Sequence, residues 1–300
     1  MKRVILYILL AIVICCNYSC NKENSINEVN PLDSENELTI KGNFWLEMGD
    51  GTIVSASDID FYDVSTHTIH VKKRLPYIEK FGFNHGIMSV HVNKIKIYEC
   101  IFHSVICSHI SLGVFASGFS SYDSNSSIIS VLFNPNQKES DPRNDKRIIA
   151  ALKNNHLYHE GLRCEIQSVN YSNGELVLNI ELYNPDTFYY HYLDPDKMGI
   201  GLFHYFTNGP SFIDNQYQSY HHKETVIYPE PWNLLEEEWL TLIKSGERKK
   251  ISITYHNFDN MPAGHYKMYF SFPGYYTTKD KIYGNMIGMS NINTEKEVTF

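Results

Sequence analysis

The fold is decided by the stretch Glu175-Leu176-Val177-Leu178-Asn179-Ile180-Glu181-Leu182-Tyr183. Leu or Ile occupies every second position from 176 to 182, which gives an extended strand one continuous apolar face. Residues 163–169 form a second strand-like stretch, and the turn-forming sequence Asn170-Tyr171-Ser172-Asn173-Gly174 lies between the two. The sequence therefore predicts an antiparallel hairpin with one buried face.

Further strands are predicted downstream at residues 199–207, 250–257, 266–272 and 297–300. Turn sequences separate them, such as Asn208-Gly209-Pro210 and Ser245-Gly246-Glu247. Residues 235–242 fit a helix or a strand, and no strong helix is expected elsewhere after Gly161. Short strands divided by turns favour an antiparallel β-sandwich over residues 161–300.

This region contains the series from Leu178 to Asn184, Gly246-Glu247 before a strand, and Pro262-Ala263-Gly264-His265-Tyr266 before the last long strand. Together these three features resemble immunoglobulin-like (Ig-like) sandwich domains, and most closely the BsuPI-type proteinase-inhibitor domain. The resemblance covers roughly residues 165–273 and implies a fold, with peptidase inhibition as an alternative function. The chain departs from that inhibitor by its signal peptide and by a long insertion at residues 210–234.

Residues 38–160 mix strand and helix patterns and predict an N-terminal α+β domain. Strands are expected at residues 37–47, 67–72 and 88–104. One helix is expected after Asp141 as its cap, with Pro142 at its first position and Ile148, Ile149 and Leu152 on one face. The overall prediction is a mainly β chain whose domain boundary lies near Gly161.

The first twenty residues have the order of a targeting peptide. Met1-Lys2-Arg3 is basic, residues 4–16 are apolar but too short to span a bilayer, and Ser19 directly precedes Cys20. This order resembles a bacterial lipoprotein signal that ends at Cys20. Such signals usually carry Leu where this chain has Asn17, and Cys15 and Cys16 are competing positions. The resemblance implies lipidation at Cys20; an ordinary secretory signal or an uncleaved anchor is the alternative.

Residues 21–37 are polar and predict a flexible tether between the lipid and the folded part. Lys22-Glu23 resembles the export signals of Bacteroidota surface lipoproteins, which implies an outer-membrane or cell-surface location. The net charge of −8 and the pI near 5.9 argue against a nucleic-acid partner. The basic run 248–250 precedes a strand pattern and is predicted to be a solvated turn.

Three cysteines, Cys100, Cys107 and Cys164, remain after the signal, and apolar alternation around them favours buried thiols over a disulfide. The segment from Cys100 to His109 also contains His103, so its donors are compatible with zinc. On an extended strand Cys100 faces away from the other three donors, which are spread over roughly 20 Å. A β-strand without metal is therefore preferred.

Other polar clusters are assigned to structure rather than chemistry, and neither a cofactor nor a metal is expected. Asp194 and Asp196 lack the longer acidic series of an EF-type calcium loop. Asp58, Asp60 and Asp63 are interpreted as turn and solvent residues. His159-Glu160 begins like a zinc protease motif, but Arg163 stands at the place of the second histidine.

His221-His222 lies in the polar insertion with Tyr217 and Tyr220. An ordinary exposed loop is expected there, and a surface contact with a metal or a glycan is the alternative. Neither a Gly-x-Ser-x-Gly elbow nor a phosphate-binding Gly-Lys-Ser/Thr loop is present. The sequence therefore predicts a lipid-anchored envelope protein without catalytic residues, which binds a protein or a glycan through loops such as 208–232. An extracellular peptidase inhibitor and an unrecognised extracellular hydrolase are the alternatives.

Overall fold

The computed structural model describes residues 42–79, 86–103, 111–120, 126–134, 140–207, 209–230, 236–273 and 291–300. The chain divides into two compact units. Within the described residues, the first contains 42–59, 75–119 and 131–157, and the second contains 60–74, 120–130 and 158–300. Two stretches of the predicted N-terminal domain, 60–74 and 120–130, thus belong to the second unit. The predicted signal, Cys20 and the tether lie outside the described residues.

The first unit contains an ordered run of strands, β2-β1-β5-β6-β7, and the helix α3. Its elements are β1 (Phe44–Met48), β2 (Ile53–Ser55), the 3-10 turn η3 (Ala56–Asp58), α2 (Pro76–Glu79), β5 (Gly86–Val92), β6 (Ile95–His103), β7 (Gly113–Ser120), η4 (Pro142–Asn144) and α3 (Lys146–Asn154). β6 and β7 pair in parallel, whereas β1 pairs antiparallel with β2 and β5.

The predicted helix exists, but its cap differs from the prediction. Asp141 caps the turn η4, and the side chain of Asp145 accepts the Arg147 amide at the start of α3. Ile148 and Leu152 are buried as expected, whereas Ile149 is only partly buried.

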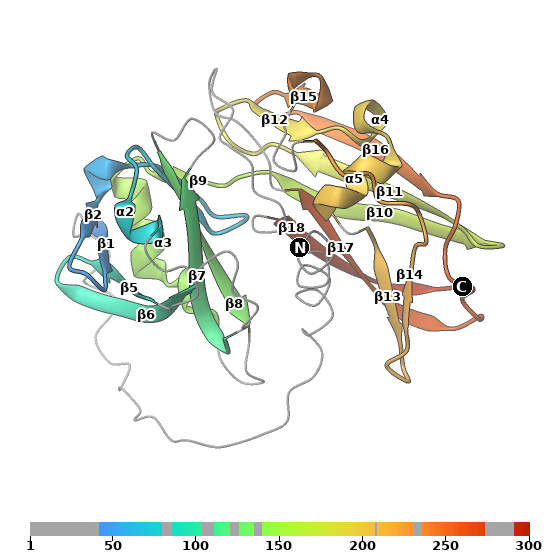
Figure 1. The fold of residues 1–300 in the computed structure, drawn as a ribbon, viewed down its shortest axis with the longest axis horizontal. Coiled ribbons are helices and arrows are strands. Elements are labelled where there is room, and N and C mark those ends of the chain that lie inside the picture. The colour runs from blue at the N-terminus through green and yellow to red at the C-terminus, as the bar shows by residue number, and fades with distance from the viewer. Residues whose placement is uncertain are drawn as a thin grey trace. The chain divides into compact units, whose positions relative to one another are not determined.

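The second unit consists of strands in several sheets with short helices between them (Figure 1). Its elements are β3 (Ile59–Asp63), β4 (Thr68–Val71), β9 (Tyr158–His159), β10 (Arg163–Ser172), β11 (Glu175–Tyr183), β12 (Tyr190–Leu193), α4 (Pro195–Met198), α5 (Ile200–Thr207), β13 (Ser211–Asp214), β14 (Ser219–His221), η5 (Glu237–Trp239), β15 (Leu240–Ile243), β16 (Arg248–Tyr255), β17 (His265–Pro273) and β18 (Asn291–Thr299). The strand β8 (Ser127–Asn134) has residues in both units. The sheet orders are β8-β4-β3-β9, β10-β11-β16, β12-β15 and β14-β13-β17-β18.

The chain is therefore mainly β, as predicted, and the hairpin that decides the fold is present. β10 and β11 pair antiparallel from Arg163 with Tyr183 to Ser172 with Glu175. Asn173 and Gly174 both have left-handed backbones, with φ values of 51° and 80°, as a tight two-residue hairpin turn requires. The predicted strands near 250–257, 266–272 and 297–300 are β16, β17 and the end of β18.

The prediction of a strand at residues 199–207 was wrong, because these residues form the helix α5. Asp194 caps the preceding helix α4, and Gly199 adopts a φ of 75° between the two helices. Phe203, His204 and Phe206 are all buried, so α5 presents little polar surface. A helix that is apolar on most sides has no clear 3.6-residue period, and its aromatic residues favoured the strand interpretation.

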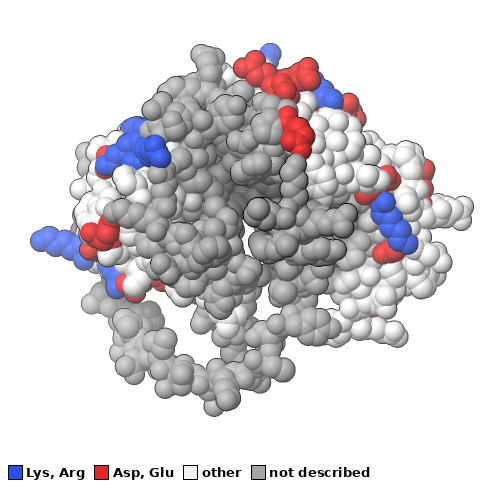
Figure 2. All heavy atoms as spheres, in the orientation of Figure 1, with Lys and Arg blue, Asp and Glu red and all other residues white. Residues whose placement is uncertain are grey.

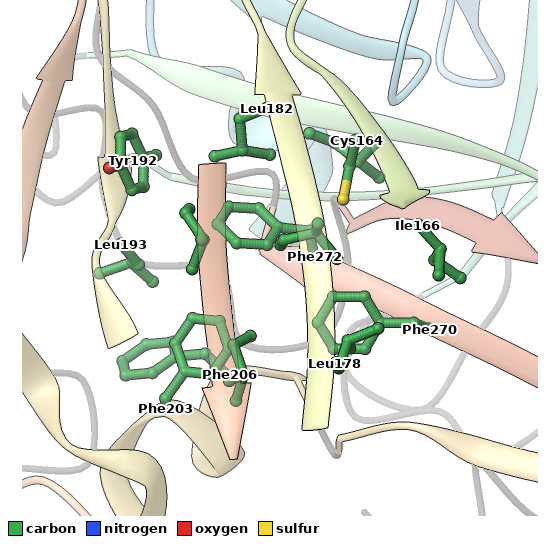
Figure 3. Packing of buried hydrophobic residues seen from close by; sticks show 14 of the residues in the cluster. Cys164, Ile166, Leu178, Leu182, Tyr192, Leu193, Phe203, Phe206, Phe270 and Phe272 are labelled. Atoms are coloured by element: carbon green, nitrogen blue, oxygen red, sulfur yellow. The ribbon is translucent and has the colours of Figure 1, made fainter. Parts of the chain in front are cut away.

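The core of the second unit is formed by side chains from two antiparallel sheets and α5. β11 contributes Leu178 and Leu182, β17 contributes Phe270 and Phe272, and α5 contributes Phe203 among others. Figure 3 shows these side chains converging from their separate elements. The buried alternation along β11 thus packs against the sheet that contains β17.

Lys296 on β18 joins the edges of these two sheets. β10 has an irregularity between Ile166 and Ser168, so Gln167 is an extra residue in the ladder. The Lys296 Nζ donates to the carbonyl oxygens of Ile166 and Gln167, each at 2.8 Å. A charged donor therefore satisfies backbone acceptors at the bulge and connects β18 to β10.

We predict that Lys296→Met lowers the free energy of unfolding of the second unit by about 1–2 kcal/mol, because two charge-assisted hydrogen bonds are lost. Lys267→Met on β17 is the matched control, since Lys267 makes an exposed ion pair with Glu295. The control should cost no more than about 0.5 kcal/mol. Chemical denaturation followed by tyrosine and tryptophan fluorescence measures both, and equal losses would contradict the role given to Lys296.

Candidate functional site

The segment from Cys100 to His109 was considered for zinc, and the structure describes only its first part, up to His103. Cys100 is a buried free thiol whose pKa is raised to about 12 by burial, so the nucleophilic thiolate is scarce at neutral pH. His103 Nε2 is hydrogen-bonded to the hydroxyl of Ser111 at 2.9 Å. Cys107 and His109 lie outside the described residues. Among the residues that are described, no group of three or more His, Cys, Asp or Glu side chains is placed to hold a metal ion.

The carboxylates at 194 and 196 serve the local structure. Asp194 Oδ1 accepts the Asp196 amide at 3.0 Å, and Oδ2 accepts the hydroxyl of Thr241 at 2.5 Å. Both oxygens are therefore used to begin α4 and to fix it to β15. Asp58 plays a similar part, because its Oδ2 accepts the amide and hydroxyl of Ser55.

The structure corrects the sequence interpretation of Asp63, which was a residue of a solvated turn. Its side chain is fully buried, and Oδ1 accepts the Ser65 amide and hydroxyl at 2.8 and 2.7 Å. Oδ2 has no hydrogen-bond partner among the described residues. Burial raises the pKa of Asp63 to about 7, despite the hydrogen bonds that oppose this shift.

A second polar cluster lies next to Asp63 and links His159, Tyr190 and Asp186. The Tyr190 hydroxyl donates to Asp186 Oδ2, so its oxygen accepts from His159 Nδ1 at 3.0 Å. Asp186 also accepts the amides of Glu160 and Gly161, at 2.8 and 2.9 Å. The cluster thereby fastens the end of β9 to β12 and to the loop before it.

Gly161 is required at this point for space as well as for conformation. Its φ is 77°, and a Cβ atom there would lie 2.2 Å from Asp63 Oδ1. No side chain fits so close to another heavy atom, so Asp63 and the backbone at 161 are packed directly against each other. The sequence analysis identified Gly161 only as the predicted domain boundary, and it did not predict the contact with Asp63.

Four stacked rings close this cluster, and we call them the ring column: His70, Phe61, His159 and Phe188. Successive ring centroids lie 3.9, 4.6 and 4.3 Å apart. His159 is only 6% exposed, and Phe61 and Phe188 cover the two faces of its imidazole. A hydrogen-bonded carboxylate, phenol and imidazole can orient a general base. Here the covered imidazole instead serves to hold β3, β9 and the 184–188 loop together.

The β13–β14 hairpin presents the most exposed aromatic side chain among the described residues. We define its hairpin tip as residues 215–219, all of which are exposed. Asp214 holds the turn, since Oδ1 accepts the amides of Gln216 and Gln218 at 2.8 and 2.9 Å. Its Oδ2 accepts the Tyr220 hydroxyl at 3.2 Å. The tip is thus fixed from below by one carboxylate.

Tyr217 lies in this fixed turn with 84% of its surface exposed and a φ of 63°. The last residue of a three-residue hairpin loop is usually a left-handed glycine. Tyrosine in that conformation costs roughly 1–2 kcal/mol. A strained, exposed aromatic residue on an ordered loop is a feature that marks functional positions.

The predicted histidine pair divides between two environments. The amide of His221 donates to Asp259 Oδ2 at 2.8 Å at the end of β14. The ring of His222 instead stacks on the buried ring of His204 from α5. Sequence reasoning did not identify His204, since its helix was interpreted as a strand.

The first unit contains a separate open cavity of about 400 Å³ between β5, β6 and the start of β7. The side chains of Ile87, Ile101 and Leu112 line it and are partly exposed, and Glu99 is the acidic residue at its wall. Glu99 and Cys100 are the ionisable residues among those described at its wall, and burial keeps the Cys100 thiol neutral at neutral pH.

On the face drawn in Figure 2, the Lys and Arg side chains that are coloured lie in small groups close to acidic side chains. The basic run at residues 72–74 is exposed at the end of β4, and the run 248–250, predicted to be a solvated turn, instead begins the strand β16. The described helices include none that is long and apolar enough to cross a bilayer.

No protein-family model matches the chain, and comparison with curated proteins gives no match.

We predict that Asp63→Asn flattens the pH dependence of stability. Burial raises the pKa of Asp63 in the folded protein to about 7, above its ordinary value of 3.8. The folded state therefore binds the extra proton, and its stability is fully present below pH 3.8 and declines by up to about 1.4 kcal/mol per unit as pH rises to 7. Asn keeps the Oδ1 acceptor without the charge.

Denaturation at several pH values from 4 to 8 measures this effect. The difference in unfolding free energy between Asp63→Asn and wild type should grow in favour of the variant as pH rises. Parallel curves for the two proteins would show that Asp63 titrates as it does in the unfolded chain.

Proposed function

We propose that the chain is a lipid-anchored cell-envelope protein that binds a partner through the hairpin tip. In this proposal Cys20 carries the lipid, residues 21–37 form the tether, and the protein resides at the outer membrane or cell surface. The two sheets that share the core of the second unit form an Ig-like sandwich, which displays the tip. The partner is a protein or a glycan, and neither a cofactor nor a nucleic acid takes part.

The observation that carries this proposal is the exposure of Tyr217 on an ordered turn. A rigid aromatic residue offers a large contact area at a small cost in conformational entropy, and tyrosine is enriched at binding hot spots. Asn215, Gln216 and Gln218 surround it with uncharged hydrogen-bonding groups, since Asp214 is used within the turn. Binding by such a surface requires no catalytic group.

We predict that Tyr217→Gly weakens partner binding at least tenfold while raising the unfolding free energy by up to about 1 kcal/mol. Glycine relieves the left-handed backbone, and the anchor side chain is lost. Tyr217→Asn tests the same separation, because Asn also tolerates this conformation. Tyr189→Ser is the matched control, as Tyr189 is an exposed aromatic residue before β12.

Capture from envelope and culture extracts with the full-length protein in detergent identifies the partner, by mass spectrometry and glycan profiling. A saturable partner that Tyr217→Gly loses and Tyr189→Ser retains supports the proposal. Equal capture by wild type and Tyr217→Gly would remove the hairpin tip from the interface.

We predict that Cys20→Ala abolishes incorporation of labelled palmitate and releases the protein from the membrane fraction. Cys15→Ala and Cys16→Ala should retain the label, since Cys20 directly follows the small residue Ser19, whereas Cys15 follows Ile14 and Cys16 follows Cys15. Metabolic labelling and fractionation of cells measure both effects. A labelled Cys20→Ala protein would place the lipid elsewhere.

Inhibition of a peptidase is a second candidate, which the same rigid, exposed turn favours. A peptidase that prefers aromatic residues would accept Tyr217 in its primary pocket. Titration of such peptidases with the protein distinguishes this function from presentation to another partner. No inhibition at micromolar protein would count against it.

A further inference from the structure

Two stacked histidines lie at the base of the β13–β14 hairpin. His204 comes from the last turn of α5, and His222 directly follows β14. Their ring centroids are 3.5 Å apart and their planes are inclined by 15°. We call these two rings the histidine stack. His204 is fully buried, so one member of the stack is shielded from water.

The other end of the hairpin also rests on the histidine stack. Gly209 precedes β13 and has a φ of 69°. A Cβ atom on Gly209 would lie 2.4 Å from His204 Cε1 and 2.6 Å from His222 Cδ2. The chain therefore enters and leaves the hairpin in direct contact with the two rings, and the stack cannot separate without disturbing this base.

The surroundings of His204 do not favour a positive charge. Neither of its ring nitrogens has a hydrogen-bond partner among the described residues. The ring of Tyr255 on β16 lies 5.2 Å away by centroid, and its hydroxyl also has no described partner. A buried imidazolium needs an acceptor for each N–H, and none is supplied by these groups.

The other titratable groups near the histidine stack are engaged elsewhere. His222 Nδ1 accepts the amide of Glu224 at 3.2 Å. Glu224 Oε1 accepts the amides of His256 and Asn257, at 2.7 and 3.0 Å. Asp259 forms an ion pair with Lys223 and accepts the His221 amide. None of these described contacts compensates a charge on His204.

We propose that the histidine stack is an acid-sensitive support for the hairpin tip. As the pH falls below neutral, protonation of the stack separates the two rings and loosens the base of the hairpin that presents Tyr217. Two like charges in contact repel each other, and a buried one is poorly solvated. The consequence for partner binding rests on the function proposed above, whereas the loosening itself does not.

The direction of the pH effect follows from the charge balance. Burial, and to a smaller extent His222, lower the pKa of His204 from 6.5 to about 3. The closed hairpin therefore binds fewer protons than the open one between these two values, and closing is disfavoured as the pH falls through 6.5. For one histidine the closed-to-open ratio should decrease about 30-fold from pH 7.5 to pH 5.

Amide hydrogen exchange of the full-length protein in detergent tests this proposal. After correction for intrinsic exchange rates, protection of β13 and β14 should fall at least tenfold from pH 7.5 to pH 5, relative to the β10–β11 hairpin. In His204→Phe, which keeps a buried ring without a titrating nitrogen, the same ratio should stay within about twofold. A ratio that is independent of pH in wild type, or that falls equally in His204→Phe, overturns the proposal.

A direct titration keeps the test valid if His204→Phe does not fold. The Cε1 proton resonance of His204 in wild type should titrate well below pH 6.5, with chemical shifts of β13 and β14 following the same curve. Titration at or above 6.5 overturns the proposal. Failure of partner capture by wild type would count against the proposed function alone, because neither exchange nor titration uses the partner.

Discussion

The burial of one face of β11 is the constraint on which the second unit depends. Leu176, Leu178, Ile180 and Leu182 are at most 1% exposed, and burying each contributes roughly 1.5–3 kcal/mol. β11 is the middle strand between β10 and β16, so a slip of one residue would turn all four side chains to the opposite face. This alternation therefore sets the register of three strands and positions the apolar face that the residues of β17 and α5 cover.

The buried polar groups of this unit fall into two classes, those with hydrogen-bond partners and those with polar atoms that have no described partner. Asp186 and Tyr190 satisfy each other and the backbone at 160–161, and they join segments far apart in the sequence. His204 and Asp63 Oδ2 instead keep polar atoms without described partners. A buried polar atom without a hydrogen-bond partner lowers stability. We therefore expect the stability of this unit to respond to pH at His204 and Asp63.

Sequence reasoning succeeded where a short-range pattern determines the structure. The hairpin of β10 and β11 follows from alternation and from Asn173-Gly174, and the helix α3 follows from its spacing of apolar residues. It failed for α5, because a helix buried on most sides has no polar stripe. The burial of Asp63 and the exposure of Tyr217 in a left-handed turn depend on long-range packing and on backbone angles. The local sequence pattern around Asp63 and Tyr217 predicts neither the burial of the first nor the exposure of the second. Gly161 and Gly209 do mark two positions where the backbone lies very close to other groups.

The outer strand β18 has a consequence for how copies of this protein behave when crowded. It is nine residues long and pairs with β17 on one side, whereas β10 lies close to it on the other side, so this edge is not left open to a second chain. Glu295 pairs with Lys267 on β17, and Lys296 donates to the carbonyls of β10, so charged side chains connect β18 to both neighbouring strands. A lipid anchor would concentrate the protein in two dimensions, where edge-to-edge pairing is most favoured. The neighbouring β10 and the charges of Glu295 and Lys296 therefore oppose self-association through β18 where local concentration would promote it.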